Sequence, residues 1–187
     1  GNRYSVPCYD ALAAPKLNKY LCDRMGEEQL LRKITGFIND IGIPCEEGIV
    51  DQHTFVPGID IVEGQIVYDA VMLSTPGDLL HEAGHIAVLE ESERAVVNSP
   101  DVTGDLGNAQ AEMAAIAWSW AAAEYLDIEP EVVFHEDGYR GGSEVIMNKF
   151  HSGNYFGVDT LERFGMTTGK SKGDEISFPE MEHWLRP

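Results

Sequence analysis

Apolar residues recur three and four positions apart through residues 15–41, which is the spacing of one face of an α-helix. The pattern is interrupted at Met25 and Gly26, and Gly42 and Pro44 follow close after its end. Glycine and proline are frequent just beyond the end of a helix. We therefore expect two amphipathic helices in this segment, separated near residue 25.

After residue 48 the pattern changes to short runs rich in β-branched residues. These runs are residues 49–50, 59–62 and 65–68, and only Glu63 and Gly64 separate the last two. A two-residue link that ends in glycine is typical of a β-hairpin. The sequence therefore predicts a small antiparallel sheet or hairpin in this region.

A helical pattern returns after Thr75. Thr75 suits the N-cap, the proline that follows it suits the first helical position, and Asp78 is spaced to complete a capping box. An alanine-rich helix is expected at residues 109–126, after a loop rich in Asn, Asp, Gly and Pro. Shorter helical pieces are expected at residues 143–150 and 158–164.

A candidate metal site lies in the helix that follows Thr75, in the string HEAGH at residues 81–85. Residues four apart on an α-helix are stacked one turn apart, so the imidazoles of His81 and His85 face the same point in space. Glu82 lies about 100° around the helix from His81, where it can reach a water held by a metal. Such a string arises by chance in roughly two chains in a hundred of this composition. The pattern thus separates two metal ligands from one base.

The predicted site needs a third protein ligand, because zinc sites of this kind use three and leave a fourth position open. Glu112 is expected to fill this role, since it is the one acid on the apolar, small-residue stripe of the alanine-rich helix. Glu90, Glu91 and Asp105 remain alternatives, and Glu91 has the metzincin spacing of six residues after the second histidine. The sequence therefore predicts Zn²⁺ held by His81, His85 and Glu112.

The charge balance narrows the range of partners. The chain has 13 basic and 32 acidic side chains, for a formal net charge of -19, so we expect neither nucleic acid nor a membrane surface as a partner. Cys8, Cys22 and Cys45 make neither a close pair nor a cysteine-based zinc site, and we expect them to be inert thiols. No apolar run approaches the roughly 18 residues of a membrane helix, so we expect a cytoplasmic location.

The order of these features is helices, a hairpin, HEAGH, and then a loop and a helix with the run AEMAAIA at residues 111–117. This order resembles the zincin-like metallopeptidases of the gluzincin type, and among them most closely the ImmA/IrrE type. The resemblance covers roughly residues 45–130 and is strongest at the HEAGH string. It implies a zinc-dependent peptidase with His81, His85 and Glu112 as ligands and Glu82 as the acid/base.

The predicted fold is α+β, mostly helical, with a small antiparallel sheet or hairpin before the HEAGH helix. At 187 residues the chain is long enough for one compact core and short for two. We therefore expect one zincin-like domain over residues 1–187. Its parts would be N-terminal helices in residues 1–45, a catalytic core in residues 46–130 and a C-terminal helical part in residues 131–187.

The expected activity is zinc-dependent hydrolysis of a peptide or protein substrate, with Glu82 taking a proton from the zinc-bound water and returning it to the leaving amine. The strand at residues 65–69 is expected to be an edge along which an extended peptide pairs. One alternative is a catalytically silent regulatory or partner-binding protein of the same fold, and another is a hydrolase of a non-peptide amide. The side chains that could stabilise the oxyanion are candidates only: His135, Tyr139, His151 and Tyr155. His53 and His183 stay outside the predicted site.

Overall fold

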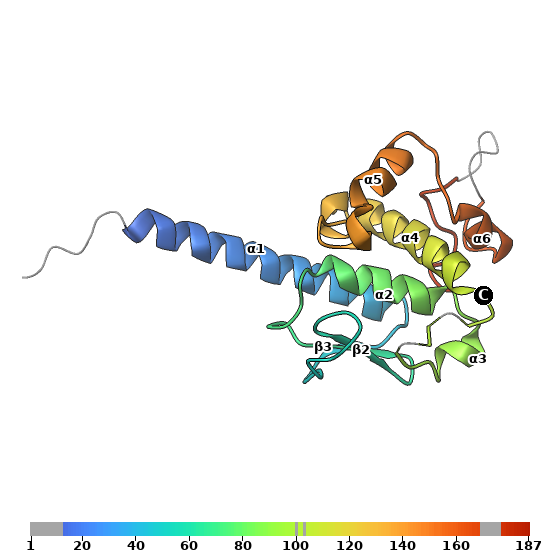
Figure 1. Ribbon diagram of the computed structural model, residues 1–187, viewed down its shortest axis with the longest axis horizontal. Helices are drawn as coiled ribbons and strands as arrows, with labels where there is room; N and C mark the ends of the chain where they lie inside the picture. The colour runs from blue at the N-terminus through green and yellow to red at the C-terminus, as the bar shows by residue number, and fades with distance from the viewer. Residues whose placement is uncertain (1–12, 100, 103, 169–176) are drawn as a thin grey trace, which may run out of the picture.

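The computed structural model describes residues 13–99, 101–102, 104–168 and 177–187, with side chains from residue 26 onward. This part of the chain forms an α+β fold in which helices accompany a small three-stranded mixed sheet (Figure 1). The elements, in chain order, are α1 (Ala13–Asp40), β1 (Cys45–Glu47), β2 (Ile59–Val62), β3 (Gln65–Tyr68), α2 (Gly77–Ala87), α3 (Glu91–Arg94), α4 (Asn108–Tyr125), the 3₁₀ helices η1 (Pro130–Val132) and η2 (Tyr139–Gly141), α5 (Ser143–His151) and α6 (Val158–Arg163).

The predicted hairpin is confirmed. β2 and β3 pair antiparallel, with Ile61 opposite Ile66. Glu63 and Gly64 form the turn, with φ of 48° and 77°, and positive φ at both central residues is typical of the turn that matches the twist of a hairpin. A Cβ on residue 64 would also collide with the backbone carbonyl of Arg94, so the packing of this turn requires glycine.

The remaining strand differs from the expectation. β1 pairs parallel with β3, with Cys45 opposite Ile66, so the sheet is mixed rather than antiparallel. Residues 49–50, expected as a strand, lie outside the strands, and Ile49 is 98% exposed. Two apolar residues carry too little periodicity to locate a strand. The position of β1 is decided instead by its pairing with β3.

β3 lies in the middle of the sheet, so the expectation that residues 65–69 form an exposed edge is wrong. The outer edge of β2 is also covered in part. The Ser99 N–H donates to the Ile61 carbonyl (2.9 Å), and the Glu63 N–H donates to the side-chain oxygen of Asn98 (3.0 Å). A peptide therefore cannot add to this sheet alongside β3.

α1 is one continuous helix where the sequence predicted two. Gly26, which was expected to mark the break, lies inside the helix, and a Cβ there would have no neighbour within 4 Å. An exposed glycine inside a helix costs about 1 kcal/mol relative to alanine but does not end the helix by itself. The C-terminal half of α1 reaches the core, where Ile34 and Ile38 are fully buried.

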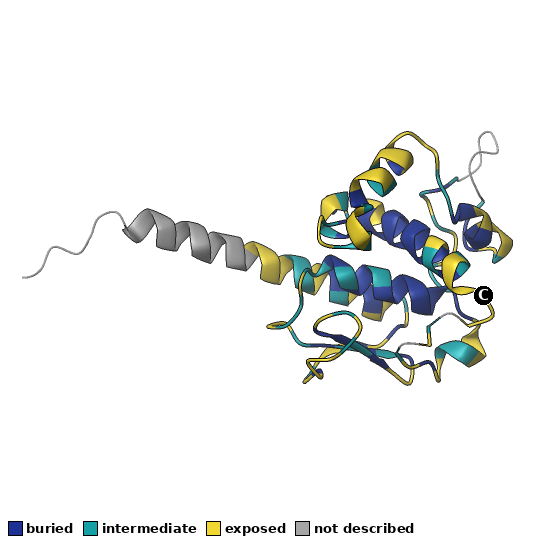
Figure 2. Ribbon diagram, in the orientation of Figure 1, coloured by how far each residue is buried: buried dark blue, intermediate teal, exposed yellow. Residues whose placement is uncertain are grey.

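α2 is at the centre of the fold. Figure 1 shows it between the sheet and α4, and Figure 2 shows buried residues along both helices. The two helices approach closely at Gly84, where an added Cβ would lie 3.0 Å from the carbonyl oxygen of Ala115. α4 spans Asn108–Tyr125, one residue from each predicted boundary, and α5 and α6 lie where the shorter helical pieces were expected.

The start of α2 lacks the predicted capping box, because its two side chains have partners elsewhere in the fold. The Thr75 hydroxyl donates to the carbonyl of Val132 (3.0 Å). Asp78 faces His135, whose Nε2 lies 2.9 Å from a carboxylate oxygen of Asp78. One local bond remains, from the Gly77 N–H to the Thr75 hydroxyl oxygen (3.4 Å), whereas Asp78 pairs with His135 in the segment after α4.

Of the three cysteines, only Cys45 has a described side chain, and it is free and buried. Burial raises the pKa of this thiol to about 12, which agrees with the expected inert thiol because the thiolate is the reactive form. Cys8 and Cys22 lie outside the residues whose side chains are described. Within the described ranges, no helix combines the length and the apolar character needed to cross a membrane.

Candidate metal centre

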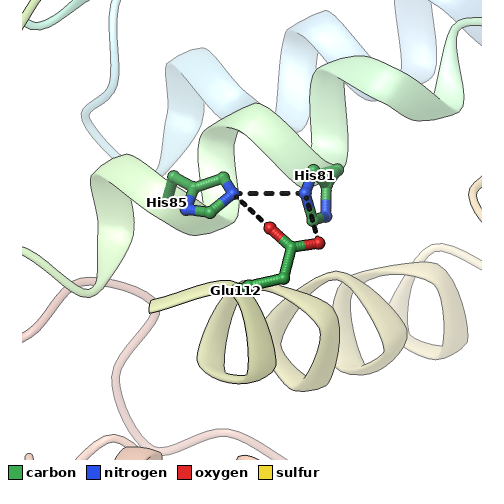
Figure 3. Close-up of side chains that lie close together, drawn as sticks. All are labelled: His81, His85 and Glu112. Atoms are coloured by element: carbon green, nitrogen blue, oxygen red, sulfur yellow. Dashed lines mark hydrogen bonds and ion pairs between the residues drawn. The ribbon is translucent and has the colours of Figure 1, made fainter. Parts of the chain in front are cut away.

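His81 and His85 lie one turn apart on α2 and turn their imidazoles toward each other (Figure 3). Their Nε2 atoms are 3.2 Å apart. Both side chains are largely withdrawn from solvent, with exposed fractions of 14% and 9%. Two imidazole nitrogens held this close and this buried need a shared partner, because unpaired buried polar groups cost free energy.

Glu112 approaches this pair from α4, the neighbouring helix (Figure 3). One of its carboxylate oxygens lies 3.5 Å from His81 Nε2 and the other lies 3.2 Å from His85 Nε2. Gly84 and Ala115 permit this approach, because they let α2 and α4 pack closely. The three residues singled out in the sequence therefore come together as a group that could hold a metal ion.

The electrostatics of this group follow from its composition. Burial raises the pKa of Glu112, but the two imidazoles outweigh it and hold that pKa far below its usual range. Burial lowers the pKa of His81, and the hydrogen bond and charge of Glu112 reverse this and raise it. The carboxylate is thus ionised and offers its lone pairs to whatever the histidines bind.

The other acids considered as ligands lie elsewhere. Glu90 and Asp105 each lie 2.9 Å from the guanidinium of Arg186. Glu91 begins α3 and is exposed. Among the residues that the structure describes, no group besides His81, His85 and Glu112 gathers three such donor side chains. The spacing of the metzincin type therefore does not apply to this chain.

Glu82 is next to the pair in sequence and lines the same cleft, although only 9% of the residue is exposed. Burial raises its pKa, while the two histidines act in the opposite direction. Its carboxylate makes no hydrogen bond to any described residue, and its oxygens are not sealed from solvent. Glu82 is therefore free to hold a water beside the three donors.

Tyr139 contacts the centre directly. Its hydroxyl lies 3.1 Å from Nδ1 of His81, the ring nitrogen that faces away from the donor group. A partner at that nitrogen fixes the orientation and the tautomer of a ligand histidine. Burial raises the pKa of the phenol, so Tyr139 stays neutral and its oxygen can accept a hydrogen bond from the Nδ1–H of His81. The sequence named Tyr139 only as a candidate, because its place beside His81 depends on a loop.

Asp78, in the first turn of α2, and its partner His135 also line the cleft. The carbonyl of His135 also accepts a hydrogen bond from the Ser143 hydroxyl (2.6 Å), which ties the loop to α5. His135 was a candidate in the sequence, whereas Asp78 was assigned only to a cap. The signal that could have found Asp78 is its position three residues before His81, on the neighbouring part of the same helix face.

The two remaining candidates, His151 and Tyr155, lie outside the cleft lining, as do His53 and His183. His151 is exposed and packs edge-on against Trp120. Tyr155 packs against the rings of Phe150 and Phe178. His53 and His183 are exposed, as expected for residues outside the site.

The cleft over the donor group has a volume of about 990 Å³. One side is apolar and includes Phe55, of which 88% is exposed. Further lining residues come from α4, η2 and α5, among them Ile116, Arg140 and Ile146. The donor group is therefore open to a ligand much larger than water.

Comparison of the chain with protein-family models, with curated proteins and with solved structures finds no significant match. The argument for a function therefore rests on the geometry of the cleft and its donor group.

Proposed function

We propose that this chain is a zinc-dependent metallopeptidase of the zincin type. The observation that carries the proposal is the convergence of His81, His85 and Glu112 beside the unpaired carboxylate of Glu82, at the base of an open cleft. Two histidines, one carboxylate and an open position form the donor set typical of catalytic zinc. The narrower resemblance to the ImmA/IrrE type stays a prediction.

The distances within the donor group support zinc. Zinc bonds to nitrogen and carboxylate oxygen of about 2.0–2.2 Å, arranged as a tetrahedron, put two ligand atoms about 3.4 Å apart. The separations are 3.2 Å between the two Nε2 atoms, and 3.5 and 3.2 Å from these atoms to the Glu112 oxygens. The two distances to Glu112 run to different oxygens, and one ligand atom from each residue can be chosen so that all three lie within 4.8 Å of one another. The donors are therefore close enough to share one ion once the Glu112 carboxylate turns toward it.

A zinc ion held by His81, His85 and Glu112 would supply a Lewis acid, which would make water nucleophilic near neutral pH and polarise a carbonyl group. Glu82 accepts a proton from the attacking water while the oxygen of that water forms a bond to the carbonyl carbon. Glu82 then gives this proton to the amide nitrogen as the carbon–nitrogen bond breaks. The products are a carboxylic acid and an amine, and Glu82 returns to its starting state.

The cleft supports a peptide substrate over a small amide. Its volume of about 990 Å³ and its apolar side are suited to several residues of an extended chain. Because β3 is a central strand, such a peptide would lie along residues 55–59 rather than pair with β3. A regulatory protein would be expected to close off its metal, and the open cleft favours the enzyme.

The test combines metal analysis with an unbiased search for cleavage. Zinc-loaded protein is incubated with a complex peptide mixture in ¹⁸O-labelled water, and new termini are identified by mass spectrometry. Each true product of hydrolysis carries the label in its new carboxyl group. We expect labelled products from the wild-type protein and none from Glu82→Gln, which keeps the shape of the side chain but cannot take the proton.

Zinc content separates the two roles in the HEAGH string. Glu82→Gln should bind one zinc per chain like the wild-type protein, and Glu124→Gln, an exposed position on α4, should match the wild-type protein in both zinc and activity. Equal cleavage by Glu82→Gln would rule out Glu82 as the base. A zinc-loaded wild-type protein that yields no labelled product would refute the peptidase proposal.

A further inference from the structure

We propose that Arg140 binds a carboxylate group of the substrate in the cleft. This inference rests on the proposed function and names its substrate class: peptides that carry a carboxylate close to the cleaved bond. That carboxylate is either the side chain of an acidic residue or the C-terminus of the peptide, and the two sources present the same group to the guanidinium.

Arg140 differs from the other basic residues because its side chain has no partner among the described residues. Every other lysine or arginine with a described side chain contacts an acid, a backbone carbonyl or an aromatic ring. These residues are Arg32, Lys33, Arg94, Lys149, Arg163 and Arg186. Among these residues only Arg32 and Arg186 pair with an acid, so Arg140 stands apart because it lines the cleft and lacks a contact of any of these three kinds.

The backbone holds Arg140 in an uncommon conformation. Tyr139, Arg140 and Gly141 have φ of 52°, 53° and 78°, so three successive residues are left-handed. Residues other than glycine rarely adopt this conformation, and such strain gathers at functional sites. The Tyr139 hydroxyl, 3.1 Å from His81 Nδ1, ties this turn to the metal centre. The position of Arg140 is thereby coupled to a metal ligand.

Arg140 is the one lysine or arginine of the cleft lining that can pair with an anionic group of a ligand. The acids in the lining are Asp78, Glu82, Glu112 and Asp137, and Arg140 is the only lysine or arginine among the lining residues. Asp78 is paired with His135, and Glu112 faces the two histidines. A guanidinium binds a carboxylate through two parallel hydrogen bonds, which fixes the orientation of the ligand as well as attracting it.

The experiment uses metal-chelating probes, so that binding can be measured without turnover. Three hydroxamates carry Leu-Glu-amide, Leu-Gln with a free C-terminus, and Leu-Gln-amide. The first two each present one carboxylate, from the side chain or from the C-terminus, and the third presents none. Their dissociation constants for the zinc-loaded full chain are measured by calorimetry at low ionic strength, where charge interactions are least screened.

We expect at least one carboxylate probe to bind the wild-type protein about tenfold more tightly than the amide probe, and the better of the two identifies the source. Arg140→Gln should bind all three alike, Arg140→Lys should keep part of the preference, and Arg140→Glu should reverse it. Arg163→Gln, at an exposed position outside the cleft lining, serves as the matched control and should leave the preference unchanged. Melting temperatures check that each variant is folded.

Equal binding of all three probes by the wild-type protein, or an unchanged preference in Arg140→Gln, would overturn the role of Arg140. Binding of the carboxylate probes by a protein that cleaves no peptide would refute the peptidase and leave the anchor standing. Failure of the zinc-loaded protein to bind any hydroxamate would overturn both proposals.

Discussion

Replacing Glu112 by alanine should separate the metal centre from a chance cluster of polar residues. The variant removes one of three donors, and no fourth acid or histidine in the described part of the chain belongs to the group. Structural zinc sites with four protein ligands bind with about 10–16 kcal/mol, or about 2.5–4 kcal/mol for each ligand. We therefore expect the zinc dissociation constant to rise about 10²–10³-fold.

The loss of zinc affinity can also be measured as a loss of thermal stability, because zinc that binds only the folded state stabilises that state. At free zinc about 1000 times the wild-type dissociation constant, this stabilisation is about 4 kcal/mol, and it falls to about 0.4–1.4 kcal/mol in Glu112→Ala. At about 2–4 °C for each kcal/mol, zinc should raise the wild-type melting temperature by about 8–16 °C. The rise in the variant should be less than about 6 °C.

The assay begins with protein stripped by a chelator and titrates zinc against a chromophoric competitor, with calorimetric melts at matched free zinc. Glu124→Ala is the control, because Glu124 is an exposed glutamate on the same helix. Its zinc affinity should equal that of the wild-type protein. An unchanged zinc affinity in Glu112→Ala would contradict the geometry of the centre and move the third ligand to another residue.

Two further variants test the surroundings of the centre. Tyr139→Phe removes the hydroxyl 3.1 Å from His81 Nδ1 and should weaken zinc binding about 10-fold in the competition assay. Tyr125→Phe, at an exposed tyrosine, is the control and should leave zinc binding unchanged. Equal zinc affinities of the two variants would show that the Tyr139 hydroxyl does not position His81. Gly157→Ala places a Cβ against the backbone of Met113 at a φ of 79°, and should lower the free energy of unfolding by more than about 3 kcal/mol in urea titrations. Gly107→Ala, with no atom near its Cβ, is the matched control, and a Gly157→Ala midpoint equal to that of this control would refute the predicted clash.

Local patterns predicted much of the fold. The hairpin of β2 and β3 follows from Glu63 and Gly64, since a two-residue turn with positive φ leaves the chain few alternatives. α4 follows from its alanine-rich composition. Two expectations failed because they depend on distant partners: β1 is held by its pairing with β3, and the predicted capping box of α2 is incomplete because Asp78 pairs with His135. The expectation of two helices in place of α1 failed for another reason, because an exposed glycine weakens a helix without ending it.

The sequence alone determined that His81 and His85 face one point and that Glu82 lies beside them, because the helix repeat fixes the directions of residues one and four apart. It also singled out Glu112 by the small residues around it. Only the tertiary structure brought Glu112 within 3.5 Å of the histidines, since that distance depends on how closely α2 and α4 pack at Gly84. It alone decided the surroundings of the centre: the Tyr139 contact, the central position of β3 and the unpaired Arg140. These features depend on loops and on strand order, which no local periodicity encodes.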